Sequence, residues 1–149
     1  MKLIRLSQDK FAKVDDEDFD KINQYKWCFI ESHGASWRRK GKGILMHRFI
    51  INAPKYLEVD HKNGDRLDNQ KNNLRICTHA DNMRNRKINK STMSGYKGVR
   101  NNHGRWQACI TFNHKFIHLG NFTDKKVAAQ KYNETAKQYF GEFARLNEL

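Results

Sequence analysis

Asp60, His61 and Asn82 are the residues of this chain whose types and spacing could do chemistry. The first two lie in the segment EVDHKNGD, where a turn-forming aspartate and a solvated loop histidine would be ordinary surface features. A carboxylate and an amide oxygen together form an oxygen donor set. Two such ligands, completed by waters and phosphate oxygens, suit Mg²⁺, which keeps much of its hydration. The residue types therefore predict one divalent ion, Mg²⁺ or Mn²⁺, if the fold brings Asp60 and Asn82 together.

A strand–strand–helix unit would bring these residues together. The segment that ends in Asp60 and His61 predicts a first strand, and NLRICT predicts a second, with Leu74 and Ile76 directed inward. Thr78, with an aspartate three residues later, is a capping-box pair and predicts a helix start. Asn82 would then lie in the first turn of a helix packed across the strand that ends at Asp60.

Composition predicts a globular protein that meets a polyanion. The 149 residues carry 29 Lys and Arg against 16 Asp and Glu, a net charge of +13. Nucleic acid is the leading partner, although a ribosomal surface or an acidic membrane would also satisfy the charge. Apolar runs are too short to span a bilayer, and no secretory signal is visible. Three widely spaced cysteines and the absence of a CxxC pair argue for a reducing compartment and against a four-cysteine zinc site. We expect a protein of the cytoplasm that is not secreted.

Charge also divides the chain. No acidic residue lies between Asp81 and Asp124, whereas eight basic residues do, which suggests contact with a phosphate backbone, a solvated basic face being the alternative. The polar segment INKSTMSG, residues 88–95, predicts a linker. The predicted division is residues 1–88, a linker at 89–94, and residues 95–149.

Each half predicts a small fold of the α+β class. In the first half we expect a strand, a short acidic helix near residues 15–23, an aromatic strand over 25–30, and a strand bearing Trp37. The segment ILMHRFIIN, residues 44–52, is ambiguous between helix and strand; a helix ended by Pro54 is favoured. In the second half, three β-prone runs precede a helix with an apolar stripe, which predicts a three-stranded antiparallel sheet packed on one helix. Trp106 and Tyr132 are expected in its core.

The first half resembles the HNH endonucleases of the phage and intron-encoded, homing type. The matching residues are VDH at Val59–His61, an asparagine in NNLR, and Asn82 in HADN. The resemblance implies a ββα-metal nuclease in which His61 activates water, Asn73 holds its imidazole, and Asp60 and Asn82 hold one divalent ion. A neutral imidazole, with a reference pKa of about 6.5, can take a proton from water.

Three neighbours leave alternatives open. Asn72 competes with Asn73 for the contact to the imidazole. His47 could be an active-site neighbour or a satisfied core histidine. His79 is out of register with the motif, and we interpret it as a helix-start or DNA-facing residue.

The second half resembles an AP2/ERF DNA-binding domain over nearly its whole length, in the segments YKGVR, GRWQACI, LGNF, AAQKYNETA and GEFARLN. Such a domain lays its sheet into the major groove, which agrees with the exposed face of the predicted sheet. Several contact positions differ from those of the plant domains, so their target sequence does not transfer. The residues expected to contact DNA are Arg84, Arg86, Lys87, Lys97, Arg100, Arg105, Gln107, Thr111 and His118.

The sequence as a whole predicts a metal-dependent endonuclease, acting as a monomer on double-stranded DNA in a bacterial or phage-infected cell. A DNA-binding regulator without cleavage is the first alternative, and a basic RNA-binding protein with a decayed nuclease motif is the second. A structural zinc protein is weaker, because Cys77 and His79 are the only close pair of soft ligands.

Overall fold

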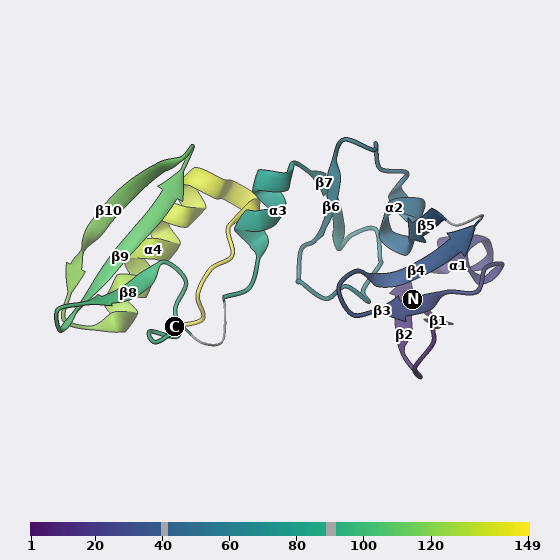
Figure 1. The fold of residues 1–149 in the computed structure, drawn as a ribbon, viewed down its shortest axis with the longest axis horizontal. Coiled ribbons are helices and arrows are strands. Elements are labelled where there is room, and N and C mark those ends of the chain that lie inside the picture. The colour runs from purple at the N-terminus through teal and green to yellow at the C-terminus, as the bar shows by residue number, and fades with distance from the viewer. Residues whose placement is uncertain (40–41, 89–91) are drawn as a thin grey trace. The chain divides into compact units, whose positions relative to one another are not determined.

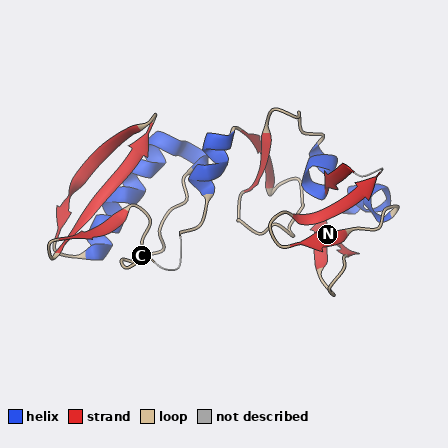
Figure 2. Ribbon diagram, viewed as in Figure 1, coloured by secondary structure: helices blue, strands red, loops and turns tan. Residues whose placement is uncertain are grey.

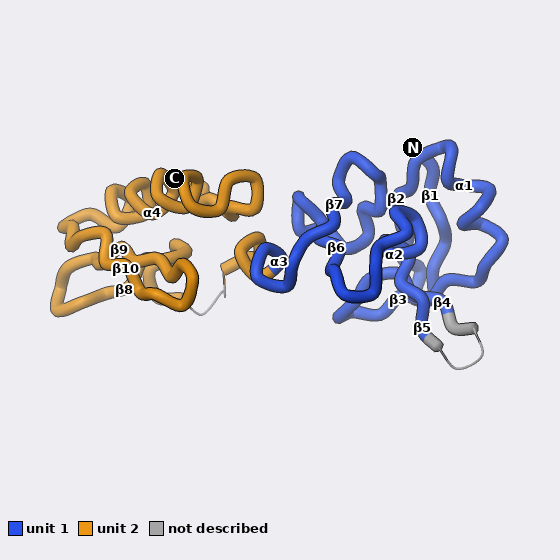
Figure 3. Tube along the Cα trace, turned by 90° about the horizontal axis from the view of Figure 1, so that it is seen from above, with its two compact units in different colours: residues 1–82 blue, residues 83–149 orange. Residues whose placement is uncertain are grey.

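The computed structural model describes residues 1–39, 42–88 and 92–149, which form two compact units (Figures 1 and 3). Unit 1 is Met1–Asn82 and unit 2 is Met83–Leu149. The predicted α+β class is confirmed, since both units combine small sheets with helices (Figure 2). No helix in the described part of the chain has the length and apolar character needed to cross a bilayer.

Unit 1 is built from short hairpins and short helices. Its elements are β1 (Lys2–Arg5), β2 (Phe11–Val14), α1 (Asp16–Asn23), β3 (Cys28–Ile30), β4 (Gly34–Arg39), β5 (Lys42–Leu45), α2 (Met46–Ile51), β6 (Glu58–His61), β7 (Leu74–Cys77) and the start of α3 (His79–Asn85). The strands named here pair antiparallel: β1 with β2, β3–β4–β5, and β6 with β7. The expected acidic helix is therefore present, and the aromatic strand is limited to β3.

The core of unit 1 combines aliphatic and aromatic side chains. Ile4, Ile22 and Met46 are fully buried, and the indole of Trp27 packs beside them while its Nε1 donates to the Ile22 carbonyl at 2.9 Å. Burial of a side chain of this size stabilises the fold by about 1.5–3 kcal/mol, because apolar surface is removed from water. This core gives unit 1 a rigid base on which the polar residues can be fixed.

The ambiguous segment 44–52 is both strand and helix. Its first two residues end β5, and α2 occupies the rest, so the predicted helix was right only from Met46 onward. Asn52 closes α2 with a left-handed φ of 47°, a conformation that asparagine tolerates. The Arg48 guanidinium then donates to three carbonyls of the following turn, at 2.6–3.3 Å, including those of Pro54 and Leu57. This turn leads directly into β6.

The hairpin β6–β7 carries the predicted motif. Its register places Asp60 opposite Arg75 and His61 opposite Leu74. Leu74 is 6% exposed as expected, whereas Ile76, also expected to point inward, is 42% exposed. The sheet has two strands, so β7 is an edge strand. The core of unit 1 covers Leu74 at the start of β7 and leaves Ile76 in solvent.

The loop between β6 and β7 is docked on β2 by main-chain hydrogen bonds. The Lys13 amide donates to the Leu67 carbonyl at 2.7 Å, and the Lys13 carbonyl accepts from the Asn69 amide at 2.9 Å. These two bonds make a short parallel bridge of Lys13 with Asp68. A polar loop that would otherwise be mobile is thus tied to a strand of the core.

Unit 2 holds a three-stranded antiparallel sheet with one long helix packed on one face (Figure 1). Its elements are β8 (Val99–Asn102), β9 (Arg105–Phe112), β10 (Lys115–Phe122), α4 (Lys125–Phe140) and the 3-10 turn η1 (Gly141–Phe143). The strand order is β10-β9-β8. This layout is the expected sheet on one helix, and its assignment to the AP2/ERF class stays a prediction.

The helix-facing side of this sheet is the core of unit 2. Ala108 and Ile110 of β9 meet Tyr132 and its neighbours on α4, and Trp106 packs at the edge. Gly98 approaches the ring of Tyr132 so closely that a Cβ there would lie 2.0 Å from a ring carbon. Trp106 and Tyr132 therefore belong to the core, as the alternation along β9 predicts.

The boundary between the units lies inside α3, after Asn82. The predicted division into 1–88, 89–94 and 95–149 stays a prediction, and residues 89–91 of its linker lie outside the described residues. Ser94, the last residue of that linker, is buried, and its hydroxyl donates to the carbonyl of Val99 at 2.6 Å. At least this residue belongs to the fold of unit 2.

Candidate active site

Asp60 is buried against the guanidinium of Arg75. Arg75, its cross-strand neighbour, donates from Nε at 2.8 Å and from a terminal nitrogen at 2.6 Å, and both bonds end on Oδ2 of Asp60. The two side chains are 9% and 6% exposed. A buried carboxylate needs such a partner, because an uncompensated charge in the interior is costly. Arg75 therefore fixes the orientation of the carboxylate through one of its two oxygens.

His61 is buried beside Asp60, with 7% of its surface exposed, and contacts an asparagine. Its Nε2 lies 3.3 Å from Oδ1 of Asn69. An amide oxygen only accepts, so this contact requires the proton on Nε2 and makes Nδ1 the basic nitrogen. Burial lowers the pKa of His61, against the opposing effects of Asn69 and Asp60. The imidazole is therefore neutral near pH 7 and able to accept a proton.

His47 of α2 packs against His61, which favours the active-site alternative for this residue. The two ring centroids are 5.1 Å apart and the rings meet edge to face. Burial, and then the neighbouring His61, lower the pKa of His47 to about 3. Its Nδ1 has no hydrogen-bond partner among the described residues. His47 is thus a neutral ring against which the His61 imidazole rests.

Asn73 ties down the loop between β6 and β7. Its Oδ1 accepts from the Asn63 amide at 3.1 Å, and its Nδ2 donates to the Asp68 carbonyl at 2.7 Å. Asn73 is buried and Asn72 is exposed, which separates the two competitors for an internal role. The contact of Asn73 with the His61 imidazole stays a prediction. The side-chain amide that contacts Nε2 of the ring is that of Asn69.

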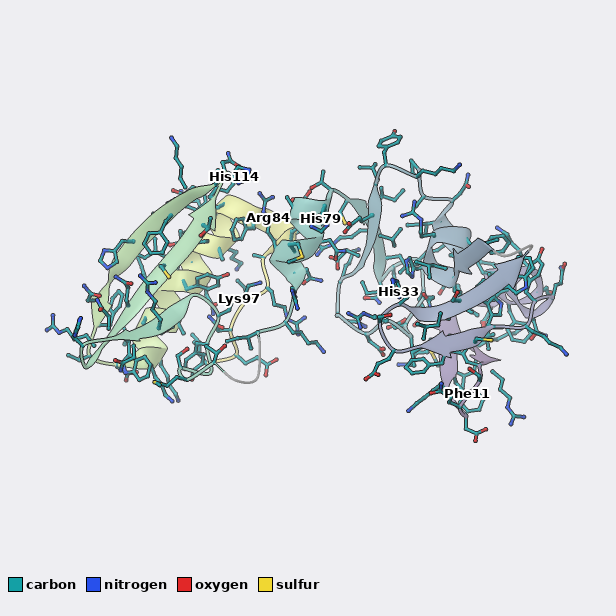
Figure 4. The ribbon with its side chains drawn as sticks, in the orientation of Figure 1. Phe11, His33, His79, Arg84, Lys97 and His114 are labelled. Atoms are coloured by element: carbon teal, nitrogen blue, oxygen red, sulfur yellow. The ribbon has the colours of Figure 1, made fainter. Side chains whose placement is uncertain are left out.

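Asn82 and His79 both bond to Glu58, the first residue of β6. Asn82 Nδ2 donates to one carboxylate oxygen at 2.6 Å, and His79 Nδ1 lies 2.7 Å from the other. These contacts lower the pKa of Glu58, the one with Asn82 most strongly. His79, labelled in Figure 4, thus helps to seat the start of α3 on β6. No contact between Asn82 and Asp60 is described, so their convergence stays a prediction.

The start of α3 follows the capping-box pattern. The Asp81 amide donates to Oγ1 of Thr78 at 3.2 Å, and the hydroxyl of Thr78 donates to the Asp81 carboxylate at 2.6 Å. The first satisfies one of the unpaired amides of a helix start. The cap fixes where α3 begins and hence which side of the helix carries Asn82.

Asp60 and Asn82 carry a carboxylate and an amide oxygen, the donor types that a hard divalent ion prefers. Glu58, two residues before Asp60, lies on the same face of β6 and accepts from Asn82 Nδ2. In the described ranges no three His, Cys, Asp or Glu side chains are grouped to hold a metal. Burial raises the pKa of the Cys77 thiol to about 11.

The basic residues after Asn82 have two different environments. Arg84 packs its guanidinium over the rings of Phe140 and Phe112, at 4.9 and 5.7 Å from their centroids. Lys97 donates from Nζ to the carbonyls of Arg84 and Arg86, and burial lowers its pKa to about 8 (Figure 4). Arg86 and Lys87 are exposed. Arg84 and Lys97 thus take part in the fold of unit 2, and their contact with DNA stays a prediction.

The open face of the sheet of unit 2 is polar and basic. Arg100 donates from Nε to Oε1 of Gln107 at 2.6 Å and lies 5.2 Å from the ring centroid of Phe116, which is 55% exposed. Arg105, Thr111 and His118 are exposed. Gln107 and Phe116 therefore hold Arg100 in a defined place on a face that is open to solvent.

Three residues of the site were missed from the sequence: Glu58, Asn69 and Arg75. Arg75 could have been found, because pairing the predicted strands in register places it opposite Asp60. Glu58 had a weaker signal, its position two residues before Asp60 on one strand face. Asn69 had no signal of its own in the sequence, because several asparagines lie in the same loop and nothing local distinguishes them.

The comparisons with known proteins agree with this geometry. A family model described as HNH endonuclease matches residues 52–84, which include β6 and β7. The chain is also 33% identical over 146 residues to an uncharacterised HNH endonuclease of Acanthamoeba polyphaga mimivirus, covering 93% of this chain and 75% of the relative. The chain therefore belongs to the HNH endonuclease family. It is a DNA-cleaving enzyme, as predicted, and the regulator without cleavage is not supported.

Proposed function

We propose that the protein is a metal-dependent, homing-type endonuclease that hydrolyses a phosphodiester bond of double-stranded DNA and recognises its site with the sheet of unit 2. The observation that carries the proposal is the neutral, oriented His61 imidazole next to the buried carboxylate of Asp60. A binding module would have no need to bury these two groups side by side.

In the proposed reaction, Nδ1 of His61 takes a proton from a water molecule. The resulting hydroxide oxygen forms a bond to phosphorus, and the bond from phosphorus to the 3′ oxygen breaks. Asn69 holds the proton on Nε2 throughout, and His47 limits the tilt of the imidazole. Asp60 and Asn82 would hold one Mg²⁺ or Mn²⁺, which supplies positive charge to the phosphate and the leaving oxygen.

The second unit supplies affinity for DNA. Its AP2/ERF-like sheet would enter the major groove with Arg100, Gln107, Thr111 and His118, while Arg105 meets phosphate. Exposed Arg86 and Lys87, which follow α3 in the chain, would add phosphate contacts, so binding should weaken steeply with salt. In this proposal the protein acts as a monomer in the cytoplasm of a phage-infected or bacterial cell.

Cleavage of supercoiled plasmid and of genomic phage DNA tests the proposal. The assay is run at low salt with Mg²⁺, with Mn²⁺ and with EDTA, on the unaltered protein and on His61→Ala. We expect nicking or linearisation that needs the ion, and a rate about 10²–10⁴-fold lower in His61→Ala, as for loss of a general base. The exposed histidine variant His114→Asn is the control and should cleave normally.

DNA binding in EDTA separates catalysis from affinity. His61→Ala should bind DNA like the unaltered protein, since His61 is buried in unit 1. Binding without cleavage by the unaltered protein, with either ion and on several DNAs, would contradict the proposal.

A further inference from the structure

Glu58 holds two side chains of the first turn of α3. Its Oε2 accepts from Asn82 Nδ2 at 2.6 Å, and its Oε1 is 2.7 Å from His79 Nδ1. Residues three apart on a helix lie on one side of it, so a single carboxylate can reach both. Both contacts have the short distances of hydrogen bonds to a charged acceptor.

The contact with Glu58 determines which end of the Asn82 amide faces the carboxylate. A carboxylate accepts hydrogen bonds and donates none, so the NH₂ end of the amide must face Glu58. The oxygen is the other end of the same planar group and is turned away from Glu58. A hard cation binds the amide oxygen, whereas an NH₂ group offers it no lone pair. Without Glu58 the amide could rotate by half a turn with almost no change in shape.

We propose that Glu58 is a positioning residue that fixes the Asn82 amide with its oxygen presented to the divalent ion. The inference rests on the proposed function, in which Asn82 is a ligand. Glu58 acts through Asn82. Its effect on binding of the ion should therefore vanish when residue 82 has a side chain whose two ends are chemically the same. An aspartate has that property, because its carboxylate presents an oxygen at either end.

The test measures Mn²⁺ binding to the full chain without DNA, by electron paramagnetic resonance of the free ion. Glu58→Ala should raise the dissociation constant for Mn²⁺ about 10–100-fold, the usual cost of losing a partner that orients a ligand. Glu58→Gln keeps an oxygen that can accept from Asn82 Nδ2, so it should retain most of the affinity. Glu134→Ala removes the same charge from an exposed position on α4 and should leave binding unchanged.

The decisive comparison repeats Glu58→Ala in an Asn82→Asp background. There the substitution removes a like charge beside the new carboxylate, so Mn²⁺ binding should be unchanged or tighter. Equal weakening in both backgrounds would overturn the inference, because Glu58 would then act as a ligand itself or through its charge. Thermal unfolding of each variant confirms that the chain is folded.

Asn82→Ala separates failure of this inference from failure of the proposed function. If Asn82→Ala binds Mn²⁺ normally, Asn82 is no ligand, and the proposed metal site is wrong. If Asn82→Ala loses the ion and Glu58→Ala keeps it, the metal site stands and the positioning role of Glu58 is wrong.

Discussion

The hairpin β6–β7 and the open sheet face of unit 2 handle polar side chains in opposite ways. In the hairpin, Asp60 and His61 are buried and each is held by a neighbour from another segment. On the sheet face, Arg105 and His118 are exposed. Bond cleavage needs groups fixed before the substrate arrives, in a site poor in water. Recognition of DNA needs charge that remains accessible to a large polyanion.

The comparison has an energetic side. Buried polar groups depend on their partners, so single substitutions in the hairpin should lower stability strongly. Exposed groups keep most of their hydration when the chain folds. Substitutions on the sheet face should therefore lower DNA affinity and leave the free energy of unfolding nearly unchanged. The following variants test this division.

The largest effect is expected for Arg75→Met. The substitution leaves the buried Asp60 carboxylate without its cation, and we expect the free energy of unfolding to fall by about 3–5 kcal/mol. Urea unfolding followed by circular dichroism measures the change. Arg105→Met, on the sheet face, is the control and should change stability by less than about 0.5 kcal/mol. Equal effects of the two substitutions would remove the contrast between the regions.

An intermediate effect is expected for the pH dependence of His47. Its pKa is about 3 in the folded chain, below the value of about 6.5 expected after unfolding, so the unfolded chain binds the proton more tightly. The stabilising effect of the neutral ring is complete above about pH 6.5 and is lost as the pH falls toward 3. At about pH 4.5 the loss is about 2–3 kcal/mol, at 1.36 kcal/mol per unit.

Urea unfolding at several pH values measures this dependence. His47→Leu should flatten the decline between about pH 6.5 and 4.5, although the lowered pKa of His61 leaves part of it. His114→Asn, at an exposed position, should keep the full decline. An unchanged decline in His47→Leu would show that the buried ring does not carry the acid sensitivity.

The smallest effect is expected on the sheet face. Arg100→Ala should weaken DNA binding about tenfold, or about 1.4 kcal/mol, and reduce preference among sequences if the guanidinium reads a base. Arg105→Ala, which we assign to phosphate, should weaken all sequences alike and lower the salt slope by about 1. Fluorescence anisotropy over a salt series distinguishes the two. If Arg100→Ala instead lowers the free energy of unfolding, Arg100 has a structural role like that of the buried polar residues of the hairpin.

The elements with a local signal were predictable. The cap at Thr78 specified the start of α3, and the alternation along β9 specified which face of the sheet is covered. Asp60 and His61 were singled out because VDH resembles the motif of the HNH endonucleases, and they end β6 together as expected. These features depend on neighbours in sequence, which a single chain displays.

The partners of those residues were less predictable, because they depend on the final packing. His61 bonds to Asn69, and nothing in the polar loop distinguishes this asparagine from Asn63 or Asn72 until the loop is docked on β2. Alternation along β7 predicted Ile76 to point inward, and yet it is exposed, because the core of unit 1 reaches only Leu74. Segment 44–52 changes from strand to helix within one apolar run, where periodicity cannot locate the boundary.

The position of the unit boundary inside α3 limits how this protein can be recombined with others. A gene fusion made after Asn82 would keep only the first four residues of α3, and so short a piece does not stay helical without its last turn. The cap at Thr78 would then have no helix to cap, and the amide of Asn82 would lose its support. Exchange of the second unit between such enzymes should succeed only when the junction falls after Asn85.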